Sequence, residues 1–172
     1  GKIVGSHLQA IKSVGDRAEI CAAVDINEAA VRQFCAENAI PKAYTSVQVM
    51  LATEKPDLVC IATPPATHKD ICIQALESGA WVYCEKPLCG SLAEFDEISA
   101  AEKLTGRYVN TVFQWRFGSA VKHIRRLMAE QALGKPLVAV CNTLWYRTQD
   151  YYDVSWRGSY ASEFGGPTVG LG

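Results

Sequence analysis

The sequence has little net charge and no long apolar run. Its 17 Lys and Arg residues against 18 Asp and Glu residues leave a net charge of −1. A balance of this kind provides no general electrostatic attraction to nucleic acid or to an anionic membrane. No apolar stretch approaches the ~20 residues that a membrane-spanning helix needs, and no signal-peptide pattern is present. We therefore expect partners other than nucleic acid and membranes.

The sequence also lacks the cysteine spacings of disulfide frameworks and zinc sites. Its seven cysteines are an odd number, and they form neither a C-x-x-C motif nor a cluster with the three histidines. Most fall on apolar faces of expected strands or helices, where a free cysteine behaves as a small hydrophobic residue. We therefore expect free thiols, a reducing cytoplasmic location and no bound metal.

Short apolar runs alternate with helical segments along the first two thirds of the chain. The runs expected to form strands are residues 18–25, 57–63, 81–84 and 107–114. Ser91 and Glu94 form a capping box at the start of one of the intervening helices. This alternation is typical of β-α-β units, and it predicts an α/β protein with a Rossmann-type, doubly wound parallel sheet.

The pattern changes near Phe117. An amphipathic helix follows, then an apolar segment over 136–147 that is expected to form a long strand, and then a polar loop rich in aromatic residues. We place a domain boundary at about residue 117. Residues 1–117 are expected to form the dinucleotide-binding domain, and residues 118–172 the start of a C-terminal substrate and oligomerisation domain.

Ligands of a doubly wound sheet bind at the carboxyl ends of its strands. The opening Gly1, Lys2 and Ile3 lead directly into a helix, whose first backbone N–H groups are suited to a pyrophosphate. Asp25 ends the next strand, where a carboxylate accepts hydrogen bonds from ribose hydroxyls. Neither Ile26 nor its successor offers a cation for a 2′-phosphate, which favours NAD over NADP. The alternative interpretation of Asp25 is a plain helix N-cap.

Several motifs together resemble one protein family. "GKIVGSH", "VDIN", "IATPPATH", "CEKPL", "FQWRF" and "WRG" with a later "GGP" have the order and spacing of the Gfo/Idh/MocA family. The resemblance runs along almost the whole chain, and "EKP" after a "TPP-x-x-H" loop is its most specific part. It implies an NAD(P)-dependent dehydrogenase of sugars, inositols or related polyols. It also implies a homo-oligomer in the full-length protein, with an open sheet in an α+β substrate domain.

The resemblance also indicates how this chain relates to the family pattern. When the sequences are aligned on His7, Gly1 takes the second glycine of the family fingerprint and Val4 the third. In the family, an Asp or Asn and then a His follow "GGP", and here Gly170 stands at the acidic position. We therefore expect an internal piece of a longer gene product, without the first strand and most of the C-terminal domain. This piece is expected to be inactive by itself.

Lys86 in "CEKP" is the candidate catalytic residue. On its own, a Lys-Pro pair after a strand is most simply a surface lysine at a turn. The resemblance implies instead that Lys86 binds the reacting hydroxyl of the substrate and assists its proton transfer. In the family the bond between this lysine and the following Pro87 is commonly cis, which aims the side chain. Glu85 is expected at the cofactor site as an orienting partner rather than a second catalyst.

Other residues near the expected strand ends complete the predicted cofactor site. Thr63, Pro64 and Pro65 are expected to brace the dinucleotide through backbone and apolar contacts, and Gln114 is expected to contact it from the fourth strand. Two interpretations of His68 are open, since it either lines the cofactor crevice or caps the helix that it begins.

The predicted substrate-binding residues lie near and beyond the domain boundary. Arg116 either holds a polar substrate or forms an ion pair between the domains. Tyr146, Trp156 and Arg157 offer aromatic faces beside fixed donors, which suits a sugar ring, but a plain aromatic packing cluster is the alternative. Two other functions also remain open: a non-catalytic NAD-binding sensor or scaffold, and a lyase or glycosidase that works through transient NAD oxidation.

Overall fold

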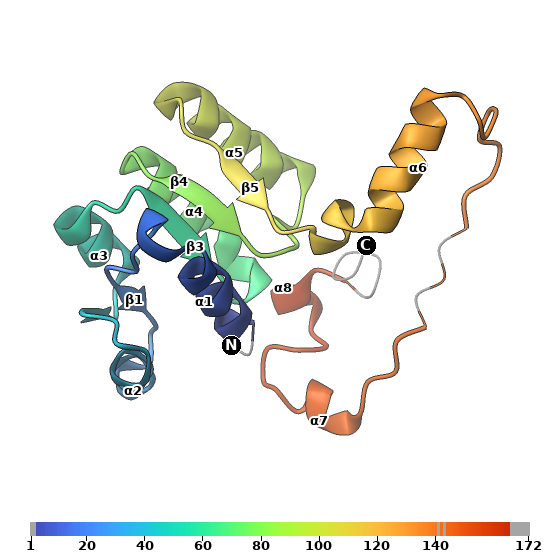
Figure 1. The fold of residues 1–172 in the computed structure, drawn as a ribbon. Coiled ribbons are helices and arrows are strands. Elements are labelled where there is room, and N and C mark those ends of the chain that lie inside the picture. Colours follow the sequence, from blue (N-terminus) through green and yellow to red (C-terminus); the bar gives the residue numbers. More distant parts are fainter. Residues whose placement is uncertain (1–2, 141, 143, 166–172) are drawn as a thin grey trace.

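The computed structural model describes residues 3–140, 142 and 144–165. Its larger part alternates helices and strands, as the sequence predicts (Figure 1). In chain order the elements are α1 (Val4–Ser13), the 3₁₀ turn η1 (Gly15–Arg17), β1 (Ala23–Val24), α2 (Glu28–Asn38), β2 (Ala43–Tyr44), α3 (Val47–Glu54), β3 (Leu58–Ile61), the 3₁₀ turn η2 (Pro65–Thr67), α4 (His68–Glu77), β4 (Trp81–Cys84), α5 (Leu92–Thr105) and β5 (Val109–Thr111).

All strand pairs among the described residues are parallel. They form two hydrogen-bonded sheets, one of order β1-β2 and one of order β3-β4-β5. The doubly wound pattern has the strand order 3-2-1-4-5-6. Here β1 and β2 correspond to the strands numbered 2 and 3 in that pattern, and β3, β4 and β5 correspond to those numbered 4, 5 and 6. The described residues contain no counterpart of strand 1, which would lie between β1 and β3, so the two sheets are separate. The Rossmann-type prediction is confirmed.

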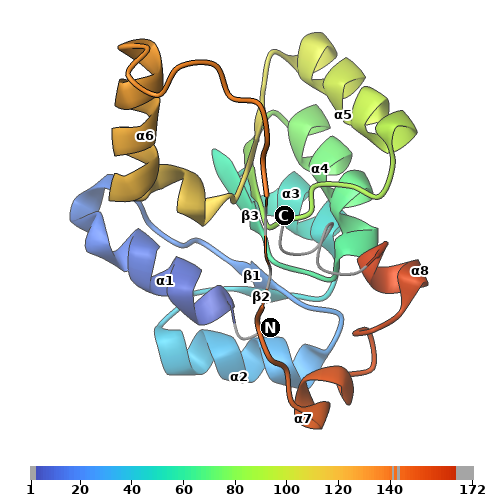
Figure 2. The ribbon, with the colours of Figure 1, turned by 90° about the vertical axis from the view of Figure 1, so that its right-hand side faces the viewer.

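The main core lies between the three-stranded sheet and the two helices that cover one of its faces. Along β3, exposed and buried residues alternate, and Val59 and Ile61 point inward. Val82 and Cys84 do the same on β4 and meet Leu76 of α4 in the core. Figure 2 shows α4 and α5 on this side of the sheet and α1 on the other. Strand side chains alternate between faces, so one residue in two contributes to this core.

The start of α5 shows how the local sequence sets a helix boundary. The Ser91 side-chain oxygen accepts a hydrogen bond from the Glu94 N–H at 3.2 Å, and the Glu94 carboxylate accepts one from the Gly90 N–H at 2.7 Å. The helix ends at Gly106, which has a φ of 67°. The reciprocal bonds satisfy N–H groups that the first helical turn leaves without intrahelical partners.

The chain after β5 is packed much less closely. It contains the 3₁₀ turn η3 (Gln114–Phe117) and the helices α6 (Ser119–Ala129), α7 (Gln149–Tyr152) and α8 (Tyr160–Glu163). The strand predicted over 136–147 is wrong for the residues that the structure describes there, since none of them is in a strand. Leu137 and Val138 are mostly exposed. A strand needs a neighbour for its backbone hydrogen bonds, and no described segment pairs with this one.

The cysteines that the structure describes are free thiols. None of the helices in the described ranges is long and apolar enough to cross a membrane. No group of three or more His, Cys, Asp or Glu side chains in those ranges is arranged to hold a metal ion.

Candidate active site

Most of the predicted site residues within 3–117 lie at or just after the carboxyl ends of strands. Asp25 follows β1, Thr63 follows β3, Glu85 and Lys86 follow β4, and Gln114 follows β5. Because β3, β4 and β5 are parallel neighbours, their carboxyl ends lie at one edge of the three-stranded sheet. Thr63, Glu85 and Lys86 therefore lie at that edge, and Asp25 lies at the carboxyl end of β1 in the two-stranded sheet. Gly1, Lys2 and Gly170 lie outside the described residues.

Asp25 is exposed at the end of β1, and it is not the cap of the following helix. Its Oδ1 accepts a hydrogen bond from the Asn27 N–H at 2.9 Å. The N-cap of α2 is Asn27, whose side chain accepts a bond from the Ala30 N–H at 3.0 Å. The N-cap interpretation of Asp25 is therefore wrong. Its carboxylate and the neighbouring Ile26, which is 94% exposed, both face solvent at the strand end.

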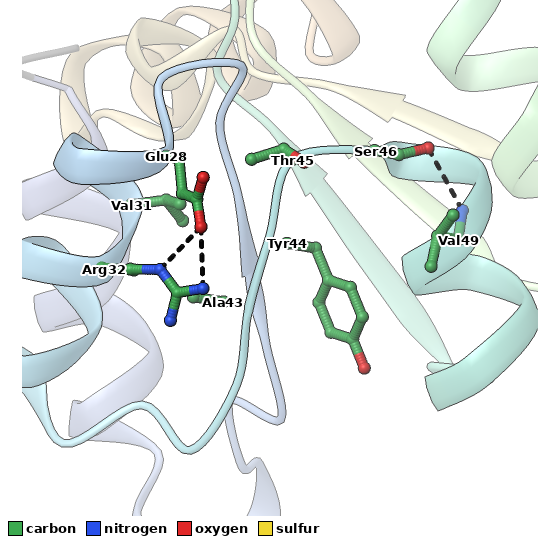
Figure 3. A pocket seen from close by; sticks show the side chains of 8 residues that line it. All are labelled: Glu28, Val31, Arg32, Ala43, Tyr44, Thr45, Ser46 and Val49. Atoms are coloured by element: carbon green, nitrogen blue, oxygen red, sulfur yellow. Dashed lines mark hydrogen bonds and ion pairs between the residues drawn. The ribbon is translucent and has the colours of Figure 1, made fainter.

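A pocket lies between α2, β2 and the start of α3, close to the backbone of Asp25 (Figure 3). Glu28 and Arg32 of α2 line it together with Tyr44, whose carbonyl oxygen accepts a hydrogen bond from the Asp25 N–H at 3.1 Å. The Arg32 guanidinium donates to Glu28 Oε1 from Nε at 2.9 Å and from Nη2 at 2.7 Å. The cation on this face of α2 is thus paired with a carboxylate of its own helix.

Glu85 is a buried carboxylate at the base of the candidate catalytic lysine. Its Oε1 lies 2.8 Å from His7 Nε2 of α1, and its Oε2 accepts the Lys86 N–H at 3.3 Å. The His7 ring also meets the Tyr83 ring edge to face, with centroids 5.7 Å apart. Lys86 itself is half-buried, and the bond between it and Pro87 is cis. Glu85 therefore joins α1 to the end of β4.

His68 is fully buried and holds two loops together. Its Nδ1 lies 2.7 Å from the Pro87 carbonyl oxygen, and its Nε2 lies 2.9 Å from the Thr63 carbonyl oxygen. Carbonyl oxygens only accept hydrogen bonds, so a ring nitrogen of His68 is the donor wherever one of these bonds is made. His68 makes no side-chain cap, and it has no exposed surface for a ligand. The cap interpretation is wrong, and His68 contacts the backbone of Thr63 and Pro87 rather than lining a crevice.

The other predicted cofactor residues lie in the turn after β3 and in η3. Thr63 is exposed, and its hydroxyl accepts a hydrogen bond from the Thr67 hydroxyl at 2.7 Å. Pro64 is half-buried and Pro65 is buried beneath the same turn. Gln114 is exposed in η3, as is Arg116.

The predicted ion pair of Arg116 is not found among the described residues. Its side chain is exposed and makes no ion pair within 3–140, 142 and 144–165. The role of Arg116 toward a polar substrate stays a prediction.

The aromatic residues beyond the boundary divide into two groups. Arg157 lies 3.9 Å from the Tyr151 ring centroid and 4.3 Å from the Trp156 ring centroid, and its Nη1 is 3.5 Å from Glu163 Oε1. Trp156 and Arg157 therefore belong to one packed cluster, which is the alternative that the sequence left open. Tyr146 is 84% exposed and lies outside it.

This cluster is close to the turn after β3 because α8 contacts η2. The ring of Phe164, directly after α8, lies against Gly90, where a Cβ atom would come within 2.6 Å of ring carbons. Gly90 follows the "EKPLC" turn by one residue. The contact between Phe164 and Gly90 thus brings the far end of the chain to the loop that carries Lys86.

The cysteines near the site are not suited to act as nucleophiles. A hydrogen bond with Cys72, and then burial, raise the pKa of the Cys84 thiol well above its ordinary value. The thiolate is the nucleophilic form of cysteine, so a thiol held protonated is unreactive. Lys86 is thus the candidate reactive group at this strand end.

His7 is the functional candidate that sequence reasoning missed. The sequence pattern gave His7 no role beyond its place after the glycine fingerprint. Its partner Glu85 is 78 residues away, so no local pattern connects the two. The available signal was its place on the inner side of α1, one residue before the buried Leu8.

Parallel strands alternating with helices, with an acid after β1, are typical of dinucleotide-binding folds. The comparisons with known proteins agree. The model of the oxidoreductase family with an NAD-binding Rossmann fold, GFO_IDH_MocA, matches residues 1–113, and the chain belongs to this family. The predicted resemblance is confirmed.

Individual relatives are dehydrogenases. The chain is 27% identical over 74% of its length to trans-1,2-dihydrobenzene-1,2-diol dehydrogenase of Xenopus tropicalis and covers 38% of it. It is 27% identical over 80% of its length to myo-inositol 2-dehydrogenase of Thermotoga maritima and covers 41% of that protein.

A solved structure matches almost the entire chain. The WlbA dehydrogenase of Bordetella pertussis, in complex with NADH and UDP-GlcNAcA, has a TM-score of 0.93 and 27% identity. The match covers 99% of this chain and 53% of that one. The chain thus spans about two fifths to one half of the length of these relatives.

Proposed function

We propose that the protein transfers a hydride between NAD and a hydroxyl-bearing carbon of a sugar, inositol or related polyol. The observation that carries this proposal is the placement of Thr63 and the Glu85–Lys86 pair at the carboxyl ends of adjacent parallel strands, with an exposed Asp25 after β1. The family match supports the oxidoreductase class. The chemistry of the diol and inositol relatives supports the substrate class.

Asp25 is suited to hold the ribose of the cofactor. It is an exposed carboxylate that already uses Oδ1 for the Asn27 N–H, a bond that fixes its orientation. A carboxylate in this place accepts from ribose hydroxyls and repels a 2′-phosphate. Arg32, the cation of the adjacent helix face, is paired with Glu28. This charge arrangement fits NAD, with NADP as the weaker ligand.

Lys86 is suited to handle the proton of the substrate hydroxyl. NAD, when bound, supplies the hydride acceptor for the carbon that carries this hydroxyl. Lys86 binds the hydroxyl oxygen and takes its proton as the carbonyl group forms, or returns it in the reverse direction. Thr63 and Pro64 border the cofactor, while His68 holds their turn to the Pro87 carbonyl. Arg116 and the exposed Tyr146 stay candidates for polar and aromatic contacts with the substrate.

The test is turnover of the full-length protein with Lys86 replaced. A general acid–base group contributes roughly 10²–10⁴-fold, so Lys86→Ala is expected to lower kcat by about that factor and to leave the Kd for NAD nearly unchanged. Lys103→Ala, at an exposed position of α5, is the matched control and keeps wild-type kcat. A Lys86→Ala variant with near wild-type turnover of an inositol or sugar would remove Lys86 from the mechanism.

A further inference from the structure

We propose that His7 is a positioning residue for Lys86, acting through the carboxylate of Glu85. Its catalytic consequence rests on the proposed function, whereas its effect on the backbone at Lys86 does not. His7 belongs to α1, and Glu85 and Lys86 follow β4, so the interaction connects the first described helix to the candidate reactive strand end.

The Glu85 carboxylate is too buried to rely on water for its hydrogen bonds. The side chains of Glu85 and His7 are only 11% and 13% exposed. A buried carboxylate needs donors for both oxygens. His7 Nε2 serves Oε1 at 2.8 Å and the Lys86 N–H serves Oε2 at 3.3 Å. The Glu85 carboxylate therefore has two hydrogen-bond donors, the His7 ring of α1 and the backbone of Lys86 after β4.

The position of His7 is fixed independently of Glu85. Its ring packs against the Tyr83 ring at an interplanar angle of 89°. Tyr83 lies two residues before Glu85, and residues two apart along a strand share a face. The His7 ring thus packs against Tyr83 and points its Nε2 at Glu85. Because the Glu85 N–H donates to the Ile61 carbonyl at 2.9 Å, the backbone of Glu85 is held by the sheet and its carboxylate by His7.

This arrangement predicts what the loss of His7 changes. Without its donor, the Glu85 carboxylate turns toward water and its Oε2 leaves the Lys86 N–H. The backbone at Lys86 then shifts, while the sheet bond of Glu85 persists. A displacement of about 1 Å at a reacting group can cost about 10²-fold in rate. His7 therefore sets the direction of Lys86 without contacting the substrate.

The experiment compares His7→Leu with His7→Gln in the full-length protein. Leucine removes the donor, whereas the glutamine side-chain amide keeps an N–H near the position of Nε2. The backbone amide resonance of Lys86 is expected to move in His7→Leu and to return toward its wild-type position in His7→Gln. The amide resonance of Glu85, bonded to Ile61, is the internal control and stays in place in both variants. In parallel, kcat is expected to fall about 10-fold or more in His7→Leu, with little change in the Kd for NAD.

Three results would overturn the inference. They are a Lys86 amide that is unmoved in His7→Leu, a loss of kcat that His7→Gln does not restore, and a wild-type His7 ring that carries its proton on Nδ1 rather than Nε2. The last is read from nitrogen-15 spectra of the wild-type protein and needs no variant. Absence of wild-type turnover contradicts the proposed function alone, since the amide and imidazole signals still report the contact between His7 and Glu85.

Discussion

Helices α4 and α6 have similar lengths, 10 and 11 residues, but opposite surroundings. α4 buries four residues, of which Cys72, Ala75 and Leu76 belong to the main core and His68 contacts the backbone of two loops. α6 buries none, although it carries Ile124 and Met128 on an apolar face, both about half exposed. An amphipathic pattern therefore predicts a helix and its inner face, but burial depends on which elements are present to cover that face.

The same contrast separates the two groups of candidate site residues. Those in residues 3–117 are placed by strand ends, since Asp25 follows β1, and Thr63 and Lys86 follow the adjacent parallel strands β3 and β4. Those in residues 118–165 lie outside the sheet, and their contacts are within one short segment. Trp156 and Arg157 pack with Tyr151, while Tyr146 stays exposed. The proposed cofactor site thus rests on the better-packed part of the protein.

The largest effect is expected from a substitution in the core of the first region. Leu76 is fully buried in α4, so Leu76→Ala is expected to lower the free energy of unfolding by about 2–5 kcal/mol. Ile124→Ala on the exposed face of α6 is expected to change it by about 0.5 kcal/mol or less. Urea unfolding of the two variants measures both values. An equal loss at Ile124 would show that its face is covered, and the contrast between the regions would fail.

A smaller effect is expected where the two regions meet. At Gly90, an added Cβ would lie 2.6 Å from the Phe164 ring, so Gly90→Ala is expected to cost about 1–3 kcal/mol. Gly5→Ala, where nothing lies within 4 Å of the added atom, is the matched control and is expected to show no such loss. The Phe164→Ala background should remove most of the penalty of Gly90→Ala in a double-mutant cycle. Additive losses would mean that the two residues are not in contact.

The smallest effect is an acid dependence at the edge of the first region. Hydrogen bonds from Lys42 and Tyr44 hold the pKa of Glu54 below its ordinary value. A carboxylate with a lowered folded-state pKa stabilises the protein above its unfolded-state pKa, and this stability is lost as pH falls through the folded-state value. Glu54→Gln should therefore flatten the acid limb of a plot of unfolding free energy against pH. If the acid limb is unchanged in Glu54→Gln, the acid dependence of stability comes from other carboxylates and the prediction is wrong.

Much of the first region was predictable because its signals are local. The positions of Asp25 and Lys86 follow from the ends of short apolar runs, and the start of α5 follows from Ser91 and Glu94. The strand over 136–147 was predicted wrongly because its apolar composition specifies side-chain preference but not a pairing partner. Strand formation there depends on residues distant in sequence.

The details of the site were less predictable because they depend on atoms distant in sequence. His68 was expected to line a crevice or cap a helix, but its two ring nitrogens meet carbonyl oxygens at Thr63 and Pro87. His7 and Glu85 are 78 residues apart, and no pattern within either segment names the other. Sequence thus predicted which strand ends carry the candidate residues, while the structure supplied the hydrogen bonds between them.

The central claim is that the strand edge marked by Asp25 binds NAD through its ribose. Titration calorimetry of the full-length protein with Asp25→Ser tests it most directly, with NAD and NADP titrated in parallel into wild type and variant. A hydrogen bond to a charged group contributes about 1.5–3 kcal/mol, so NAD affinity is expected to fall roughly 10- to 100-fold. NADP affinity is expected to hold or rise as the repulsion of the 2′-phosphate is removed. Unchanged NAD affinity in Asp25→Ser would contradict the account.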